Sequence, residues 1–405
     1  MNKYNCANQL SKHFDALYGK RTYAQFKRYN SLIRSFKKTF NAADCNVASA
    51  SGRVEFIGNH TDHNGGQVIG CAVNLDIVAA FRPNGGNTVR MLSDGYPKVE
   101  FDVSKPPQLS GGVGLIEGIT TYLKQEGYAV GGFDVYTHSN VPSGAGVSSS
   151  AAFETLIATI VNACFNDGAI PSETIARAGQ FAENKYLDKP CGLLDQGASV
   201  AGGMTLFDFS NGFCYDKLDV ATTDLRFVLV DTGKSHAGLS HLYASIPAEM
   251  LSVARFFGKQ RLVEIDPVQL YENEQTIRAK LGDRPYLRAK HFAEENARVK
   301  LMTAALRQGD DDKVIELINA SGDSSMYQLQ NCAVDKQDTA IADAIGYARS
   351  LGNVGARVHG GGFAGTVLCV VKNRDFKRVL AELRARYGEQ RVLPMTVRKV
   401  GAVVL

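Results

Sequence analysis

Residues 141–152 read Val-Pro-Ser-Gly-Ala-Gly-Val-Ser-Ser-Ser-Ala-Ala, and this stretch is the most informative about the fold. A β-type run over 133–139 precedes it, and an apolar run over 149–165, long enough for a helix, follows it. Glycines allow close backbone approach to a ligand, and a helix N-terminus offers free N–H groups and the positive end of its dipole. The stretch therefore predicts an anion site, for which phosphate is the natural ligand.

Other interpretations of this stretch are weaker. No Gly-Lys-Ser/Thr follows, so it is not a Walker A loop, and the third glycine of a dinucleotide fingerprint would fall at Ser149. The plain alternative is a serine-capped helix after a glycine turn. Capping needs fewer small residues than this stretch supplies, so we favour the phosphate loop.

Glycine is abundant along the whole chain. There are 40 glycines and 11 prolines in 405 residues, whereas an average protein has about 7% glycine and 5% proline. Three clusters, around residues 52–66, 144–146 and 355–365, hold 11 of the 40. Because apolar residues make up 44% of the chain, it can bury a large core, and the glycines mark special backbone positions.

The first cluster, residues 51–66, reads Ser-Gly-Arg-Val-Glu-Phe-Ile-Gly-Asn-His-Thr-Asp-His-Asn-Gly-Gly. Its many directional polar groups suit a polyhydroxylated ligand. His60 and His63 could suggest a transition metal, but their spacing is wrong for two ligands on one helix face. A polar surface turn is the plain alternative, although such a turn needs fewer hydrogen-bonding groups.

Two further stretches carry candidate residues. Residues 355–366 place five glycines in a turn that we expect to join two strands, either as a second wall around phosphates or as a bulged hairpin. Glu183 lies within a helical run, and Asp195 follows two leucines. A carboxylate beside apolar residues is either a buried structural group or a positioned base, and local sequence leaves both open.

Charge and cysteine content limit the partners and the compartment. The net charge is +4, and no run of five or six like charges supports a nucleic-acid or membrane partner. The eight cysteines are scattered, as in reduced cytoplasmic proteins. The first residues lack the apolar segment of a signal peptide, and the longest apolar run, 155–165, is too short for a membrane span. We expect a cytoplasmic protein.

The order of elements predicts an α+β protein. A basic helical region before residue 45 is followed by short strands to about 103 and by helices over 114–126, 149–165 and 172–186. Helices dominate after residue 247, and the last 50 residues alternate strand, glycine loop, strand, helix and strand. We predict two domains, residues 1–207 and 208–405.

Together these stretches resemble the galactokinase branch of the GHMP small-molecule kinases. The signature GRVxxIGxHTDxNGG is similar to residues 52–66, the phosphate loop to 142–151, and the third motif to 355–366. The resemblance covers roughly residues 45–370. It implies a cleft between an N-terminal mixed α/β domain, with a left-handed βαβ phosphate loop, and a C-terminal ferredoxin-like α+β domain.

The resemblance implies roles for individual residues. For ATP, the implied contacts are Ser93, Gly144, Ala145, Gly146, Val147, Ser148, Ser149 and Ser150. For Mg²⁺ the implied ligands are Ser150 and Glu183, a hydroxyl and a carboxylate that suit a hard ion. Asp195 matches the base that takes the proton of the sugar's anomeric hydroxyl, and Arg53 the cation beside it. The implied sugar contacts are Asn59, His60, Thr61, Asp62, Asp195 and Tyr243.

Asn59 departs from the family's pattern, because the branch normally has Glu at this position. Asn keeps an acceptor oxygen for the sugar's C6 hydroxyl but loses the negative charge that would repel a C6 carboxylate. The resemblance therefore implies a galactokinase acting on galactose and ATP. Kinases for galacturonate, N-acetylgalactosamine or L-arabinose, and a non-catalytic galactose sensor, remain alternatives. We expect a monomer or a small homo-oligomer.

Overall fold

The computed structural model describes residues 10–19, 23–107, 111–142, 144, 146–186, 191–220, 224–234 and 238–405. The chain forms two compact units that interleave in sequence. Unit 1 contains Met1–Arg53, Cys71–Gly203 and Thr396–Leu405, and unit 2 contains Val54–Gly70 and Met204–Met395. The change of unit after Gly203 lies close to the boundary expected at 207/208, but two short segments, residues 54–70 and 396–405, belong to the other unit.

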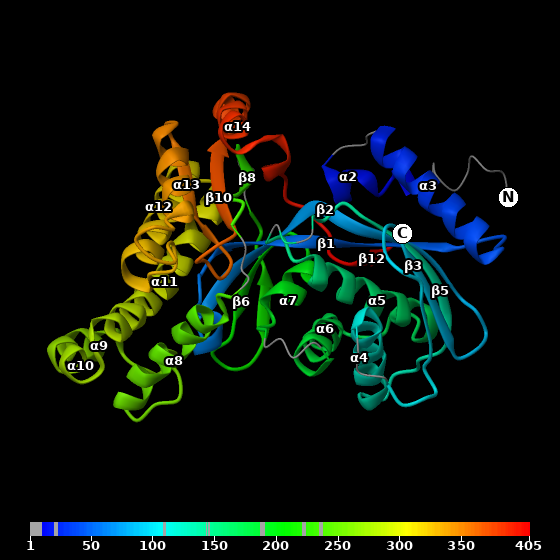
Figure 1. Ribbon diagram of the computed structural model, residues 1–405, viewed down its shortest axis with the longest axis horizontal. Helices are drawn as coiled ribbons and strands as arrows, with labels where there is room; N and C mark the ends of the chain where they lie inside the picture. Colours follow the sequence, from blue (N-terminus) through cyan, green and yellow to red (C-terminus); the bar gives the residue numbers. More distant parts are fainter. Residues whose placement is uncertain are drawn as a thin grey trace. The chain divides into compact units, whose positions relative to one another are not determined.

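Unit 1 is built on a mixed β-sheet with the strand order β12-β1-β2-β5-β3-β4 (Figure 1). The strands are β1 (Asn46–Ile57), β2 (Gln67–Pro83), β3 (Thr88–Ser93), β4 (Val99–Asp102), β5 (Phe133–Ser139) and β12 (Val403–Val404). β3 and β5 pair in parallel, whereas β2–β5, β3–β4 and β1–β12 are antiparallel. The last residues of β1 and the first residues of β2 belong to unit 2.

Strand β2 is longer than the sequence indicates. The sequence predicts only short strands in this region, but β2 continues through Asn74 without a break for 17 residues. The C-terminal segment supplies the partners that make this possible, because the Asn74 N–H donates to the carbonyl of Thr396 (3.1 Å), and Val73 bridges Val397. A pairing with the far end of the chain leaves no local signal in the sequence.

The helices of unit 1 are α2 (Phe14–Tyr18), α3 (Tyr23–Phe40), α4 (Gly111–Gln125), α5 (Ser149–Phe165), α6 (Ser172–Tyr186) and α7 (Leu194–Ala201). The helices predicted over 149–165 and 172–186 are confirmed. Helix α5 is apolar on nearly every side because α4, α6 and α7 all contact it (Figure 1). Helices α2 and α3 pack with Val47, Val78 and Ala80 of the sheet.

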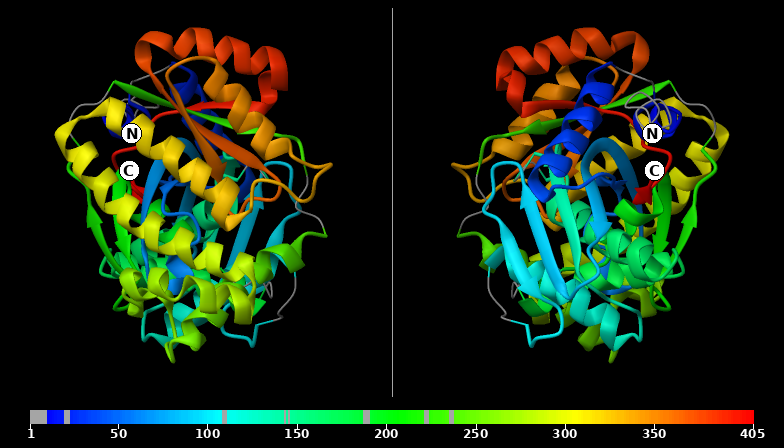
Figure 2. Two further views of the ribbon diagram at one scale, coloured as in Figure 1. Left: turned by 90° about the vertical axis from the view of Figure 1, so that its left-hand side faces the viewer. Right: turned by 90° about the vertical axis from the view of Figure 1, so that its right-hand side faces the viewer.

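Unit 2 contains an antiparallel sheet with the order β11-β8-β10-β9. Its strands are β8 (Leu225–Asp231), β9 (Val354–His359), β10 (Thr366–Lys372) and β11 (Val392–Met395). Alternate residues of these strands pack with α13 (Ala340–Ser350) and α14 (Asn373–Tyr387), as the period of a strand requires. Figure 2 shows α14, in red, lying over these strands. The predicted sequence of strand, glycine loop, strand, helix and strand is confirmed.

The rest of unit 2 is mostly helical. It contains α8 (Ser240–Phe256), α9 (Pro267–Glu272), α10 (Glu274–Leu281), α11 (Asp283–Gln308) and α12 (Asp311–Ser324), with a π-helical turn (η3) over Ser325–Leu329. A hairpin of β6 (Met204–Asp208) and β7 (Cys214–Lys217) pairs through β6 with β2. Short 3₁₀ turns lie at η1 (Asp62–Asn64), η2 (Leu262–Glu264) and η4 (Glu389–Arg391). Within the described ranges, no helix is long and apolar enough to cross a membrane.

Candidate active site

The predicted phosphate loop joins β5 to α5 in unit 1. Gly144 and Gly146 have φ angles of 76° and 75°, in the left-handed region that favours glycine. Ser148 also has a positive φ, 53°, which is uncommon for a residue with a side chain. The expected ATP contact Ala145 lies outside the described residues. The loop therefore has the special backbone that the glycines indicate, and α5 begins directly after it.

Strand β1 lies directly against this loop. The Arg53 N–H donates to the carbonyl of Val147 (3.1 Å), and Arg53 Nη1 donates to the carbonyl of Gly146 (2.5 Å). A Cβ atom on Gly52 would lie 2.7 Å from the Val147 carbonyl oxygen, so only glycine permits this approach. Gly52 and Arg53, from the first glycine cluster, thus contact and hold the phosphate loop. The sequence indicates these two stretches only as separate motifs.

Arg53 and Asp195 form the ion pair that the resemblance implies. Arg53 Nε and Nη2 donate to Oδ1 and Oδ2 of Asp195, each at 2.6 Å, in the parallel fork typical of strong arginine–carboxylate pairs. The hydroxyl of Ser148 donates to the same Oδ2. The Arg53 side chain is 9% exposed and that of Asp195 is 35% exposed. A buried cation therefore orients a carboxylate that remains accessible.

The two expected Mg²⁺ ligands lie on neighbouring helices of unit 1. Ser150 is in the first turn of α5, and Glu183 is buried on α6, a helix that contacts α5. A hydroxyl and a carboxylate oxygen are the donors that Mg²⁺ accepts while it keeps several waters, so these residues fit that ion. Burial, together with a hydrogen bond to Glu183, raises the pKa of the Cys191 thiol. A neutral thiol therefore stands beside the Glu183 carboxylate.

Ser93 ends strand β3, and its hydroxyl lies 2.6 Å from the Thr137 hydroxyl on β5. In the part of the chain that the structure describes, no hydrogen bond joins the Ser93 side chain to the phosphate loop. Its expected nucleotide contact stays a prediction.

The sugar-binding signature forms a tight turn in unit 2, and Thr61 is its centre. The Thr61 hydroxyl is fully buried and lies 2.9 and 2.8 Å from the carbonyl oxygens of Gly58 and Gln67. The carbonyl of Thr61 accepts from the N–H groups of Asn64 and Gly66. In this structure Thr61 therefore maintains the shape of the turn. Asp62 begins the 3₁₀ turn η1 and is half-buried.

The side chain of Asn59 is fully buried in unit 2. Its Nδ2 donates to Glu55 Oε1 (2.9 Å) and to the carbonyl of Gly360 (2.7 Å). Its Oδ1 accepts from Asn331 Nδ2 (2.9 Å) and Ser325 Oγ (3.4 Å). Asn59 thereby ties the signature turn to the third glycine loop, which was not expected from the sequence.

His60 makes a second link to the same loop. His60 Nε2 lies 3.0 Å from the carbonyl of Gly361, and because a carbonyl only accepts, we assign the proton to Nε2. His60 Nδ1 can then accept from His63 Nε2 (3.3 Å), and His63 Nδ1 from Asn64 Nδ2 (2.9 Å). These hydrogen bonds are complete with both imidazoles neutral. Among the described residues, no group of three histidine, cysteine or acidic side chains could hold a metal ion.

Tyr243, on α8, packs on the third glycine loop. Its hydroxyl donates to the carbonyl of Gly362 (2.7 Å), and a Cβ atom on Gly361 would lie 2.7 Å from Tyr243 Cε1. Burial raises the pKa of Tyr243 to about 12, so the phenol is neutral at ordinary pH. The loop connects β9 to β10, and His359 and Thr366 pair at its base. Asn59, His60 and Tyr243 thus converge on residues 360–362.

Several residues that position this region were missed by sequence reasoning. Glu295, on α11, is fully buried and accepts from the N–H groups of Gly58 (3.1 Å) and Asn59 (3.4 Å). His291 contacts the Asn59 carbonyl (2.9 Å), and the Asn331 carbonyl accepts from the N–H of Phe363 (2.5 Å). Single polar residues on a long helix or in an irregular turn carry no motif, so no local signal could have identified them.

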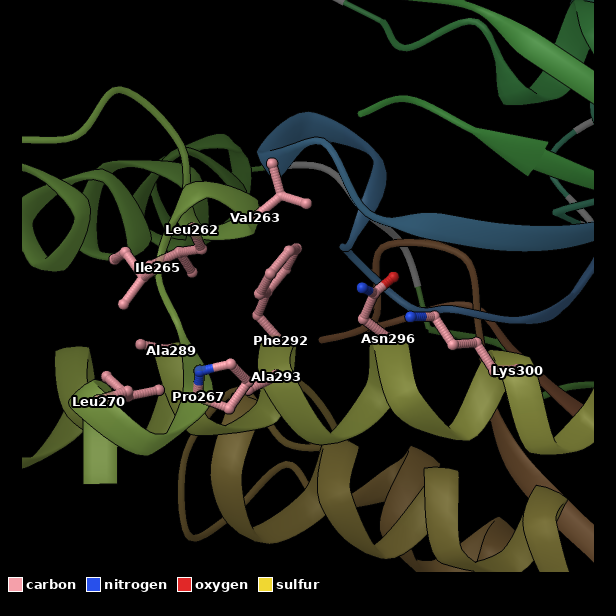
Figure 3. A pocket seen from close by; sticks show the side chains of 10 residues that line it. All are labelled: Leu262, Val263, Ile265, Pro267, Leu270, Ala289, Phe292, Ala293, Asn296 and Lys300. Atoms are coloured by element: carbon pink, nitrogen blue, oxygen red, sulfur yellow. The ribbon is translucent and has the colours of Figure 1, made fainter. Parts of the chain in front are cut away.

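A pocket of about 250 Å³ lies behind the signature turn in unit 2 (Figure 3). It is lined by Leu262, Val263, Ile265, Pro267, Leu270, Ala289, Phe292, Ala293, Asn296 and Lys300. Two of these side chains also contact the glycines of the turn. A Cβ atom on Gly66 would lie 3.0 Å from Phe292 Cε2, and a Cβ atom on Gly65 would lie 2.7 Å from Val263 Cγ1. None of the site residues expected from the sequence lines this pocket. We therefore interpret its walls as support for the turn.

Comparison with known proteins identifies matching family models over three regions of the chain. Residues 34–83 match the family model described as the galactokinase galactose-binding signature. Residues 114–203 match the N-terminal domain of GHMP kinases, and residues 302–389 match the C-terminal domain. Each of the three glycine motifs identified in the sequence falls within one of these matched regions.

Individual relatives give the same result. The chain is 31% identical over 371 residues to the galactokinase of Lacticaseibacillus casei (strain BL23), a match that covers 89% of this chain and 94% of that protein. It is 29% identical over 357 residues to the galactokinase of Lactobacillus helveticus, covering 85% of this chain and 90% of that protein. Identity at this level over most of both chains places this chain in the same family as these galactokinases.

Solved structures show the same fold. The crystal structure of Lactococcus lactis galactokinase complexed with galactose matches with a TM-score of 0.81 at 24% identity, over 93% of this chain and 100% of that chain. A mevalonate kinase matches with a TM-score of 0.61 at 16% identity, over 87% and 98% of the two chains. The chain therefore belongs to the galactokinase family of the GHMP kinases and is an ATP-dependent kinase.

Proposed function

We propose that this kinase transfers the γ-phosphate of ATP to the C1 hydroxyl of galactose and forms galactose 1-phosphate. The observation that carries the proposal is the hydrogen-bonded group of Arg53, Asp195 and the phosphate loop. Arg53 holds the carboxylate with two nitrogens and the loop carbonyl of Gly146 with the third. The residue assigned to the sugar hydroxyl and the loop assigned to ATP thus share one cation.

The chemistry needs little beyond these parts. Phosphoryl transfer depends on positioning and on neutralising charge at the transferring group, because its transition state is loose. Arg53 is assigned to stabilise that charge, and Asp195 to orient the C1 hydroxyl and accept its proton. The ion pair favours the ionised carboxylate, which is the state a proton acceptor needs. Direct transfer then requires no phosphorylated enzyme.

The nucleotide is assigned to the phosphate loop and the start of α5. Free N–H groups at that helix N-terminus, with its dipole, favour phosphate. Gly144, Gly146, Val147, Ser148, Ser149 and Ser150 are the described residues in this assignment, with Ser93 as a further contact. Mg²⁺, held by Ser150 and Glu183, would supply positive charge to the ATP phosphates.

The sugar is assigned to the signature turn and to Tyr243. The donors and acceptors of His60, Asp62 and Tyr243 are of the type that orients a polyhydroxylated ligand. Thr61 and Asn59 contribute through the shape of the turn, given their hydrogen bonds. The Lactococcus lactis galactokinase, whose fold this chain shares, is complexed with galactose in its crystal structure, and this also supports galactose as the substrate.

A coupled ADP-release assay tests the proposal across galactose, galacturonate, N-acetylgalactosamine, L-arabinose and glucose. We expect galactose to give the highest kcat/KM. A higher value for one of the other sugars would replace the substrate but keep the reaction. Binding of galactose and ATP by calorimetry, without turnover of any sugar, would instead establish a sensor. We also propose a cytoplasmic enzyme that acts as a monomer or a small homo-oligomer.

A further inference from the structure

The hydrogen-bonding capacity of Asn59 is already used. A carboxamide offers two N–H donors and two acceptor sites. Glu55 and Gly360 accept from the donors, and Asn331 and Ser325 donate to the oxygen. The residue has no solvent-exposed surface. A sugar hydroxyl could reach this side chain only by displacing one of four internal partners.

Glu55 is the carboxylate that contacts Asn59, and it has an open oxygen. Its Oε1 accepts from Asn59 Nδ2 (2.9 Å) and from Arg357 Nη2 (2.8 Å). No described residue donates to Oε2, and 11% of the side chain remains exposed. One oxygen is therefore fixed from within the protein, and the other is available to a ligand.

Arg357 makes this arrangement rigid. Its guanidinium is fully buried and also donates to the backbone carbonyls of Glu55 and Phe56. The Glu55 carboxylate therefore resembles a positioned acceptor more than half of a flexible surface ion pair, because hydrogen bonds hold both side chains.

We propose that Glu55 is a specificity-determining residue that accepts a hydrogen bond from the C6 hydroxyl of the sugar. This inference rests on the proposed function. The family normally carries a negative charge at the position of Asn59, and in this chain that charge stands four residues earlier. Glu55 Oε2 receives the hydroxyl and disfavours any C6 carboxylate by like-charge repulsion. Asn59 is a positioning residue that holds Glu55 Oε1.

Because the carboxylate stands at Glu55 and not at position 59, substitutions at these two positions should depend on each other. Asn59→Glu alone replaces an N–H donor with a second carboxylate 2.9 Å from Glu55 Oε1, so we expect it to lower both stability and activity. The double variant Glu55→Asn/Asn59→Glu keeps one carboxylate and one carboxamide in contact. We expect it to recover at least about 10-fold of the kcat/KM for galactose that the single variant loses.

The first test uses the unaltered protein and two charged sugars. We expect kcat/KM for 6-amino-6-deoxygalactose, whose ammonium group pairs with a carboxylate, to exceed that for galacturonate by about 100-fold or more. Nearly equal values would show that no carboxylate faces C6 and would overturn the inference. Galactose turnover measured in parallel separates this failure from failure of the proposed function, in which no sugar reacts.

The second test assigns the discrimination to Glu55. In Glu55→Gln, the galacturonate to galactose ratio of kcat/KM should rise by about 10-fold or more, because the repelling charge is lost. The matched control is Asn331→Ala, which removes a hydrogen-bond donor to Asn59 but no charge. We expect it to lower kcat/KM for galactose and for galacturonate by the same factor. An unchanged ratio in Glu55→Gln would overturn the inference. If Glu55→Gln fails to fold, the test is the recovery of kcat/KM for galactose in the double variant relative to Asn59→Glu, and no recovery would overturn the inference.

Discussion

Arg53 and Asp195, 142 positions apart in the sequence, are joined by two parallel hydrogen bonds of 2.6 Å. The third nitrogen of the same guanidinium binds the carbonyl of Gly146 in the phosphate loop. Charge and geometry at this point are therefore fixed before any ligand binds, and preorganised groups of this kind are the main source of electrostatic catalysis.

Asp195→Asn should reduce kcat by about 100-fold or more, because the amide cannot accept the proton of the C1 hydroxyl. ATP binding, measured by calorimetry, should change little, since Asp195 is assigned to the sugar. Near-normal turnover in this variant would contradict the assignment of Asp195 as the base.

Arg53→Lys tests the fork. Lysine keeps the charge but cannot donate two parallel hydrogen bonds and a third to Gly146. We expect kcat to fall by at least about 10-fold with a smaller change in KM, the pattern of a group that acts in the transition state. Arg177→Lys, in an exposed ion pair with Glu173, is the matched control and should leave kcat unchanged. A change in KM alone for Arg53→Lys would make Arg53 a binding group.

Ser148 combines a functional hydrogen bond with an unfavourable backbone. Both Ser148→Ala and Ser148→Gly remove the hydroxyl that donates to Asp195, so both should lower kcat. Only glycine adopts the φ of 53° without strain. The free energy of unfolding of Ser148→Gly should therefore exceed that of Ser148→Ala by about 1 kcal/mol. Equal stabilities in urea unfolding would argue against a strained Ser148.

Gly52→Ala should separate β1 from the phosphate loop. The added methyl group would lie 2.7 Å from a backbone oxygen, which cannot rotate away as a side chain can. We expect a loss of about 1–3 kcal/mol in stability and a higher KM for ATP. Gly346, on α13, has nothing within 4 Å of its Cβ position. Gly346→Ala should therefore be neutral or stabilising, and a similar loss in both variants would contradict the steric argument.

Glu295 makes stability depend on acid pH. Burial opposes its ionisation, but Arg298, His291, Arg357 and Ser321 together lower the pKa of Glu295 to about 2 from an ordinary 4.5. Because the folded pKa is the lower one, the stabilisation is present above pH 4.5 and is lost as the pH falls toward 2. In Glu295→Gln, the free energy of unfolding should be lower at pH 7 and should vary less over this range. An unchanged pH profile would contradict the role of Glu295.

The sequence predicted the local motifs well and the support around them poorly. The Gly-Ser stretch, α5 and the third glycine loop follow from composition and period, which act over neighbouring residues. The continuation of β2 past Asn74 depends on Thr396, and the anchoring of the signature turn depends on Glu295 and Asn331. Contacts between distant residues leave no periodic trace, so these features required the structure.

The role of Asn59 also depends on contacts with distant residues, which the local sequence does not reveal. Its position in the signature predicts a sugar contact, and nothing local shows that four internal partners occupy its amide. Glu55 has no motif of its own, and only its contacts with Asn59 and Arg357 indicate a role.

The most direct test of the account is the product formed from galactose and ATP, identified by phosphorus NMR while ADP release is followed. The account predicts one galactose 1-phosphate for each ADP, with both signals falling together by about 100-fold or more in Asp195→Asn. ADP release without a sugar phosphate, or phosphorylation at a carbon other than C1, would contradict it.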